Sequence, residues 1–269
     1  MKFDVVIGNP PYQSNNKRAP LWEKFVEKSF DLCEDGGHIA LIHPSAWRKP
    51  THKLFPLFQK NNLEYLEIHN QKDGMKTFGA GTRYDWYVLQ KASNRGKTVI
   101  IDENGEIYKY NIEEMGCIPH KNIDKFVSML ARDNKCEILH SRTAYGNDKS
   151  WMAKHLNEKN KFPCVYTTGA KGIKLLYSNT NANGHFGIKK VIMGKASPEN
   201  GFFDVKGEYG ITNNAFAIEV HSDEDGFELE RAIKMNSFKE FFMVLKWAGF
   251  AVDHRAFGYL KYGFWKVFI

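Results

Sequence analysis

Asp4-Val5-Val6-Ile7-Gly8-Asn9-Pro10-Pro11-Tyr12 is the stretch of sequence that decides the fold. Its three β-branched residues, Val5 to Ile7, form a short apolar run, which predicts a strand buried on both faces of a parallel sheet. Gly8 ends the run, and the two prolines fix successive φ angles and supply no backbone N–H. The chain must therefore leave the sheet in a stiff, extended turn that holds its acceptor oxygens in place.

This turn carries groups that suit an aromatic amine or an amide as substrate. The nitrogen of such a group is a poor nucleophile because its lone pair is delocalised into the π system. Two acceptors on its two N–H bonds would draw it towards tetrahedral geometry and direct the lone pair outward. The Asn9 side-chain oxygen and the Pro10 carbonyl suit that task, and Tyr12 offers a flat face for a planar group.

Asn9-Pro10-Pro11-Tyr12 after an apolar strand resembles the catalytic motif of the S-adenosylmethionine-dependent DNA adenine-N6 methyltransferases, including those of type II restriction-modification systems. The resemblance continues to Gln90 through a helix, Gly36-Gly37, an apolar strand and Pro44. It implies that a target adenine, flipped out of DNA, stacks on Tyr12 while Asn9 and Pro10 orient its amine. Asn9, Pro10, Pro11 and Tyr12 are the expected catalytic residues.

Three further residues are expected to contact the substrate. Phe78 lies in a late loop, where the family often places a second aromatic side chain against the flipped base. Lys17 and Arg18 lie in the irregular segment after Tyr12 and could meet a phosphate there.

The order of elements predicts an α/β protein. A helix at residues 21–33 follows the first strand, and an apolar strand at residues 38–42 follows the helix, which together form a right-handed βαβ unit. Further strands and a hairpin turning at Asn104-Gly105 extend the sheet. We expect a partial doubly wound, Rossmann-like methyltransferase sheet at residues 1–115 and a mixed α+β target-recognition domain at residues 116–269, with one long helix near residues 227–245.

The second part of the chain carries the basic charge. Residues 116–269 hold 22 Lys and Arg against 16 Asp and Glu, whereas residues 1–115 hold 16 against 15. This excess suits a polyanion, and double-stranded DNA is the expected partner. The candidate phosphate contacts are Lys171, Lys174, Lys189, Lys190 and Lys195.

The expected cofactor is S-adenosylmethionine, yet the sequence offers no strand followed by a convincing Gly-x-Gly turn for it. The chain therefore resembles the second half of a methyltransferase, and we expect it to be inactive alone. It is expected to be a fragment, one chain of a split enzyme or a degenerate relative. In the first two cases an upstream segment or a separate chain would supply the cofactor-binding half. Two other functions stay open, namely a protein glutamine N5-methyltransferase and a non-catalytic DNA-binding specificity module.

Other classes of protein are disfavoured. No apolar run approaches the roughly 20 residues that span a bilayer, and residues 1–15 lack a signal-peptide pattern, so a cytoplasmic location is expected. The four cysteines include no C-x-x-C pair, so neither a disulfide framework nor a metal site is predicted.

Overall fold

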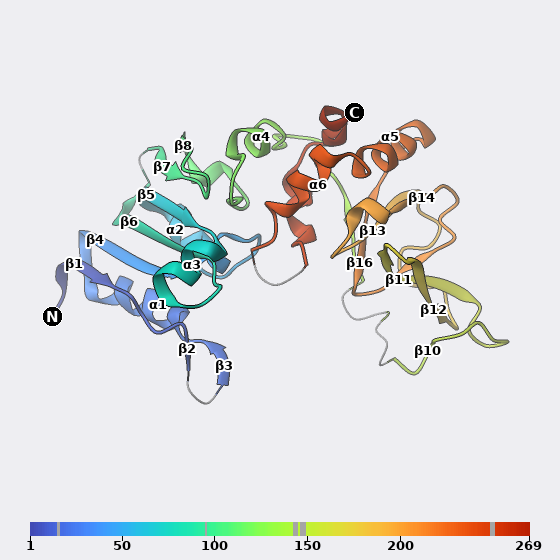
Figure 1. Cartoon of the computed structure of the whole chain (residues 1–269), viewed down its shortest axis with the longest axis horizontal. Helices are drawn as coiled ribbons and strands as arrows, with labels where there is room; N and C mark the ends of the chain where they lie inside the picture. Colours follow the sequence, from blue (N-terminus) through green and yellow to red (C-terminus); the bar gives the residue numbers. More distant parts are fainter. Residues whose placement is uncertain (15–16, 95, 142–144, 146–148, 248–250) are drawn as a thin grey trace. The chain divides into compact units, whose positions relative to one another are not determined.

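A computed structural model describes residues 1–14, 17–94, 96–141, 145, 149–247 and 251–269, with the side chains of residues 14–19 outside the description. The chain forms two compact units, Met1–Ser128 and Met129–Ile269 (Figure 1). The boundary lies later than the expected end of the first domain at residue 115. Buried Arg48 explains the difference, because its Nη1 donates hydrogen bonds to the carbonyls of Ile118 and Pro119 at 2.8 and 3.0 Å.

The first unit is built on one six-stranded sheet in the order β1-β4-β6-β5-β7-β8. Strands β1, β4, β5 and β7 run parallel to one another, whereas β6 and β8 run antiparallel to them. Gly105, with φ of 85°, makes the turn of the expected hairpin between β7 and β8. The strands are β1 (Phe3–Gly8), β4 (Cys33–Pro44), β5 (Asn61–His69), β6 (Tyr84–Ser93), β7 (Thr98–Ile101) and β8 (Ile107–Tyr110).

Two helices cover one face of this sheet. Helix α1 (Trp22–Leu32) connects β1 to the parallel β4, as the βαβ prediction requires, and α2 (Phe55–Lys60) precedes β5. The Phe58 ring of α2 lies 6.5 Å from Phe30 of α1 and 4.9 Å from Tyr87 of β6, between ring centroids. These contacts bury the apolar face of the sheet, and the predicted α/β class is confirmed.

The opposite face of the sheet is only partly covered. Phe3, Val5 and Ile7 alternate along β1 onto this face and are 42%, 58% and 80% exposed. The prediction that β1 is buried on both faces is therefore wrong. The reason is that β1 is an edge strand, paired with β4 alone among the described residues.

The second unit contains two four-stranded sheets and two longer helices. One sheet has the order β10-β12-β11-β15 and the other β14-β13-β16-β9. A buried cluster that includes Leu139, Val165, Ile192 and Ile211 draws residues from both sheets. The strands are β9 (Ile138–Leu139), β10 (Met152–Ala153), β11 (Phe162–Gly169), β12 (Gly172–Ser178), β13 (Lys190–Gly194), β14 (Phe202–Asp204), β15 (Gly210–Ile211) and β16 (Ala215–Glu219).

The expected long helix near residues 227–245 is instead two helices, α5 (Asp223–Ile233) and α6 (Asn236–Met243). Ser222 caps α5 by accepting a hydrogen bond from the Asp225 N–H at 3.1 Å, so the helix also begins earlier than predicted. Met235 lies between the helices in an extended conformation, with φ of −75° and ψ of 141°. Within the described ranges, no helix is long and apolar enough to cross a membrane.

Candidate functional site

The carboxyl ends of the parallel strands β1, β4 and β5 lie at one edge of the first sheet, which is the edge where open α/β sheets bind ligands. A pocket of about 740 Å³ lies at this edge. It is called the Asn9 pocket below. Its lining comprises Asn9, Pro10, Pro11, Tyr12, Gln13, Pro20, Trp22, Pro44, Phe78, Ala80 and Thr82.

The turn after β1 presents the Asn9 side chain to this pocket. Asn9 is exposed, and no hydrogen bond joins its side chain to another described residue. The Tyr12 carbonyl accepts a hydrogen bond from the Leu21 N–H at 3.1 Å, which ties the turn to the start of α1. The segment expected to be irregular forms a short hairpin of β2 (Gln13–Ser14) and β3 (Lys17–Pro20). Lys17 and Arg18 lie on β3, but their side chains fall outside the described part of the molecule.

Tyr12 and Phe78 form the aromatic wall of the Asn9 pocket. Their ring centroids are 5.8 Å apart with an interplanar angle of 72°, an edge-to-face contact. The Tyr12 hydroxyl is buried and has no hydrogen-bond partner among the described residues. Burial, with smaller effects from Tyr84 and Asp85, raises the pKa of Tyr12 to about 12. Tyr12 is therefore neutral near pH 7, and its ring is an uncharged surface.

Phe78 reaches the pocket because it ends a short helix that the sequence reading missed, α3 (Gln71–Phe78). Asn70 and Asp73 form a capping box at its start, and Gly79 ends it in the left-handed region with φ of 67°. Gly74 packs so closely on the following loop that an added Cβ would lie 2.0 Å from the Thr82 carbonyl oxygen. The loop that carries Ala80 and Thr82 into the pocket is thus held against the helix.

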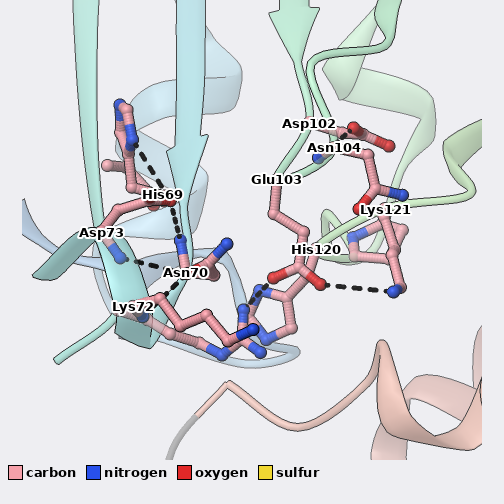
Figure 2. A network of polar contacts seen from close by, with 12 residues as sticks. His69, Asn70, Lys72, Asp73, Asp102, Glu103, Asn104, His120 and Lys121 are labelled. Carbon is pink, nitrogen blue, oxygen red and sulfur yellow. Dashed lines mark hydrogen bonds and ion pairs between the residues drawn. The ribbon is translucent and has the colours of Figure 1, made fainter. Parts of the chain in front are cut away.

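A polar network supports the same edge of the sheet (Figure 2). The Asn70 side chain accepts hydrogen bonds from the Lys72 and Asp73 N–H groups, and His69 lies between Glu67 and Asp73 carboxylates. The His69 ring also stacks on Tyr84, with centroids 4.4 Å apart. In loop segments of the same unit, Glu103 forms ion pairs with Arg83 and Lys121. The contacts of His69 and Asn70 fix the segment from which α3 begins.

His43 lies next to the pocket wall and is a packed residue. Its ring is fully buried, stacks on Trp22 at 4.6 Å between centroids, and has Nε2 3.3 Å from the Tyr87 hydroxyl. Desolvation lowers its pKa to about 4, so His43 is neutral near pH 7.

The lysines expected to contact phosphate lie in three different environments. Lys171 and Lys174 are exposed on the β11–β12 hairpin. Lys189 pairs with Asp223 at 2.5 Å near the surface. Lys195 donates a hydrogen bond to the Asn213 carbonyl at 2.7 Å and lies 2.8 Å from His140 Nε2, and burial lowers the pKa of its ammonium group.

The prediction for Lys190 is wrong. Its side chain is fully buried, and its ammonium group lies 2.7 Å from the buried Asp204 carboxylate. The charge of the side chain suggested a surface position. However, β13 is one of the two inner strands of its sheet, and Asp204 on the neighbouring β14 supplies the counter-ion. Lys190 is therefore a structural residue of this pair.

Comparisons with known proteins find relatives of the first part of the chain. Residues 1–78 match the family model described as Eco57I restriction-modification methylase. Residues 1–78 are thus similar to the restriction-modification methylases. An uncharacterized adenine-specific methylase of Mycoplasma pneumoniae is 29% identical over 128 residues, which cover 39% of this chain and 30% of that protein. The expected resemblance to restriction-modification methylases is confirmed for residues 1–78.

Solved structures of restriction-modification proteins are also similar. The type IIL enzyme MmeI, solved with DNA, matches with a TM-score of 0.47 and 9% identity over 95% of this chain and 45% of that chain. The type I enzyme EcoKI M protein matches with a TM-score of 0.31 and 15% identity over 38% of this chain and 25% of that chain. The chain thus spans less than half the length of each of these relatives.

The residues of the Asn9 pocket do not by themselves form a site for S-adenosylmethionine. None of the described lining residues is acidic, so no carboxylate is present to accept hydrogen bonds from ribose hydroxyls. The lining is made instead of proline, aromatic and small residues, which suit a planar aromatic group. Gln13, Pro20, Trp22, Pro44, Ala80 and Thr82 were not predicted from the sequence, although Pro44 ends the parallel strand β4 and so had to reach this edge.

Proposed function

We propose that this chain is the acceptor-binding and DNA-recognition part of an adenine-N6 methyltransferase of a restriction-modification system, with S-adenosylmethionine as the methyl donor. The observation that carries the proposal is that Asn9, Pro10, Tyr12 and Phe78 line one pocket at the carboxyl edge of the sheet. The relationship of residues 1–78 to the methylase family supports it.

In this proposal the chain binds and orients the adenine. The flipped base lies in the Asn9 pocket against the aromatic wall that Tyr12 and Phe78 form, and these neutral rings exclude water from the side of the base that they cover. The Asn9 side-chain oxygen and the Pro10 carbonyl accept the two N–H groups of the exocyclic amine. The amine nitrogen then presents its lone pair away from both acceptors, and the rigid Pro10-Pro11 turn keeps the acceptors in place.

The cofactor half belongs, in our proposal, to a separate chain or segment that pairs with β1. Parallel sheets of this kind are normally covered on both faces, and an open apolar edge strand is a site for further pairing. The exposed Phe3, Val5 and Ile7 of β1 continue into partly buried side chains of β4 and β6 on the same face, which include Ile42 and Trp86. A partner that adds a parallel strand and a covering helix would bury this face.

Binding measurements on the full chain test the proposal. We expect calorimetry to show no saturable S-adenosylmethionine binding, while unmethylated duplex DNA binds with an affinity that falls as salt rises. Asn9→Ala should leave DNA affinity within about twofold, because Asn9 orients only one base among many phosphate contacts. When the chain is mixed with the cofactor-binding half of a related methylase, the wild-type chain should support methyl transfer to DNA and the Asn9→Ala variant should not.

Three results would count against this function. A chain that binds no DNA would contradict it, and methylation of a glutamine in a protein substrate would favour the glutamine methyltransferase instead. Methyl transfer that persists in Asn9→Ala would leave DNA binding as the sole supported activity, as in a specificity module.

A further inference from the structure

The second unit has a pocket of its own, lined by three neighbouring strands of one sheet. It has a volume of about 690 Å³, within the range of about 300–1,000 Å³ that is usual for ligand sites. It is called the Tyr166 pocket below. Its polar lining residues are Lys154, Tyr166 and Lys174, and its apolar floor includes Leu175 and Leu176.

Tyr166 is directed by an irregularity in the sheet. Val165 of β11 pairs with Leu175 of β12, and Thr167 pairs with Lys174, so Tyr166 is an extra residue without an opposite partner. Such bulges redirect a side chain relative to the regular alternation of a strand. The bulge is anchored, because buried Thr212 donates hydrogen bonds to the Val165 carbonyl at 3.1 Å and to the Tyr166 carbonyl at 3.3 Å. These two hydrogen bonds fix the backbone from which the Tyr166 side chain projects.

The charge of this pocket is positive and uncompensated. Lys154 and Lys174 are exposed at its rim, and no ion pair joins either to another described residue. None of the described lining residues is acidic. The sequence around them, from Lys149 to Lys174, contains six lysines and a single acidic residue, Glu158. An anionic ligand with an apolar, planar part complements this combination.

We propose that the Tyr166 pocket binds one nucleotide of DNA whose base lies outside the duplex stack. The base stacks on Tyr166 above the leucine floor, and its phosphodiester lies between the ammonium groups of Lys154 and Lys174. This inference rests on the proposed DNA-binding function and adds a contact in the second unit that is separate from the Asn9 pocket. A base pair within a regular duplex cannot offer its face to Tyr166, so the site distinguishes unstacked nucleotides from paired ones.

Binding of the full chain to two oligonucleotide duplexes tests this inference. The duplexes have the same sequence, except that one carries a single-nucleotide bulge. The wild-type chain should bind the bulged duplex about tenfold more tightly. Tyr166→Leu should abolish this preference, whereas Tyr166→Phe, which keeps the ring, should retain it. Tyr12→Leu serves as a second control, and a preference that remains in this variant separates the Tyr166 pocket from the Asn9 pocket.

The lysines are tested by salt dependence. A double variant, Lys154→Ala with Lys174→Ala, should weaken binding of the bulged duplex and reduce the slope of log affinity against log salt by about 1 to 2. Lys206→Ala removes an exposed lysine that does not line this pocket and should change the slope less. Circular dichroism melting checks that each variant is folded.

The outcomes separate this inference from the proposed function. If the wild-type chain binds DNA and Tyr166→Leu keeps the bulge preference, the nucleotide site is refuted while DNA binding stands. If the wild-type chain shows no bulge preference, the nucleotide site is likewise refuted. If the wild-type chain binds no DNA, both proposals fail. Loss of the preference in Tyr12→Leu but not in Tyr166→Leu would assign the unstacked nucleotide to the first unit.

Discussion

The rings of Tyr12 and Phe78 meet edge to face, 5.8 Å apart, although one follows β1 and the other ends α3. The contact closes the Asn9 pocket on one side and buries the Tyr12 hydroxyl without a hydrogen-bond partner among the described residues. A buried polar group without a partner costs stability, so a ligand or water that reaches this hydroxyl would be favoured.

Tyr12→Phe removes the unpaired hydroxyl and keeps the ring. We expect its free energy of unfolding in urea to be unchanged or higher by up to about 1 kcal/mol. Tyr87→Phe is the matched control, because the buried Tyr87 hydroxyl lies 3.3 Å from His43 Nε2, and its removal should cost about 1 kcal/mol. Equal losses in the two variants would show that Tyr12 has a partner in solution.

Gly74→Ala tests how α3 holds the pocket loop. The added Cβ would lie 2.0 Å from the Thr82 carbonyl oxygen, which belongs to the backbone and cannot rotate away. We expect a loss of about 1–3 kcal/mol in unfolding free energy and weaker ligand binding in the Asn9 pocket. Gly81→Ala is the control, because its nearest neighbour is Met75 Cε at 3.9 Å. If Gly74→Ala keeps the wild-type unfolding free energy and the wild-type ligand affinity of the Asn9 pocket, the close packing of Gly74 on Thr82 is contradicted.

The sequence predicted the parts of the fold that depend on local pattern. The apolar runs of β1 and β4, the helical spacing of α1 and the Asn104-Gly105 turn are each decided within about a dozen residues, and all are present. Helix α3 could also have been found, because Asn70, Asp73 and Gly79 are a cap, a capping box partner and a terminating glycine. This helix has eight residues, which is about two turns and gives a short apolar pattern.

The features that were missed depend on contacts between distant segments. The exposure of Val5 and Ile7 follows from the position of β1 at the sheet edge, which the apolar run itself does not encode. Lys190 is buried because Asp204 lies opposite it on β14. Phe78, one of the predicted site residues, lines the Asn9 pocket because it ends α3 just before Gly79. The contact between Phe78 and Tyr12 could not be predicted from periodicity, because the two residues belong to separate segments.

Arg48→Met tests the ion pair that holds residues 118–120 in the first unit. Arg48 Nε and Nη2 donate to the two Asp85 carboxylate oxygens at 2.7 and 3.1 Å, and both side chains are fully buried. Loss of the arginine leaves a buried carboxylate uncompensated, so we expect a loss of about 3–5 kcal/mol in urea unfolding. Lys53→Met, which breaks exposed ion pairs to Glu23 and Glu27, should cost less than about 1 kcal/mol. Similar losses of unfolding free energy in both variants would contradict the view that the buried Arg48 pair matters more to stability than the Lys53 pairs.

Ile7→Thr tests the open face of β1. Because Ile7 is 80% exposed, the substitution should change the unfolding free energy of the chain alone by less than about 0.5 kcal/mol. Ile39→Thr, on the buried face of β4, should instead cost about 1–3 kcal/mol. A large loss in Ile7→Thr would mean that the face is already covered, for example by a second copy of the chain, and sedimentation would detect that copy.

The pH dependence of the first unit should follow His43. Its pKa is about 4 in the folded chain and about 6.5 in the unfolded chain, so between these values the unfolded state binds the additional proton. The stabilisation is fully present above pH 6.5 and is lost as pH falls towards 4, by up to about 3 kcal/mol. His43→Phe, which keeps a ring against Trp22, should have a shallower dependence in this range. Nearby His52 has a pKa that burial also lowers, so an NMR titration of the assigned His43 imidazole is the deciding measurement. Titration near pH 6.5 in the folded chain would show that this histidine is not buried.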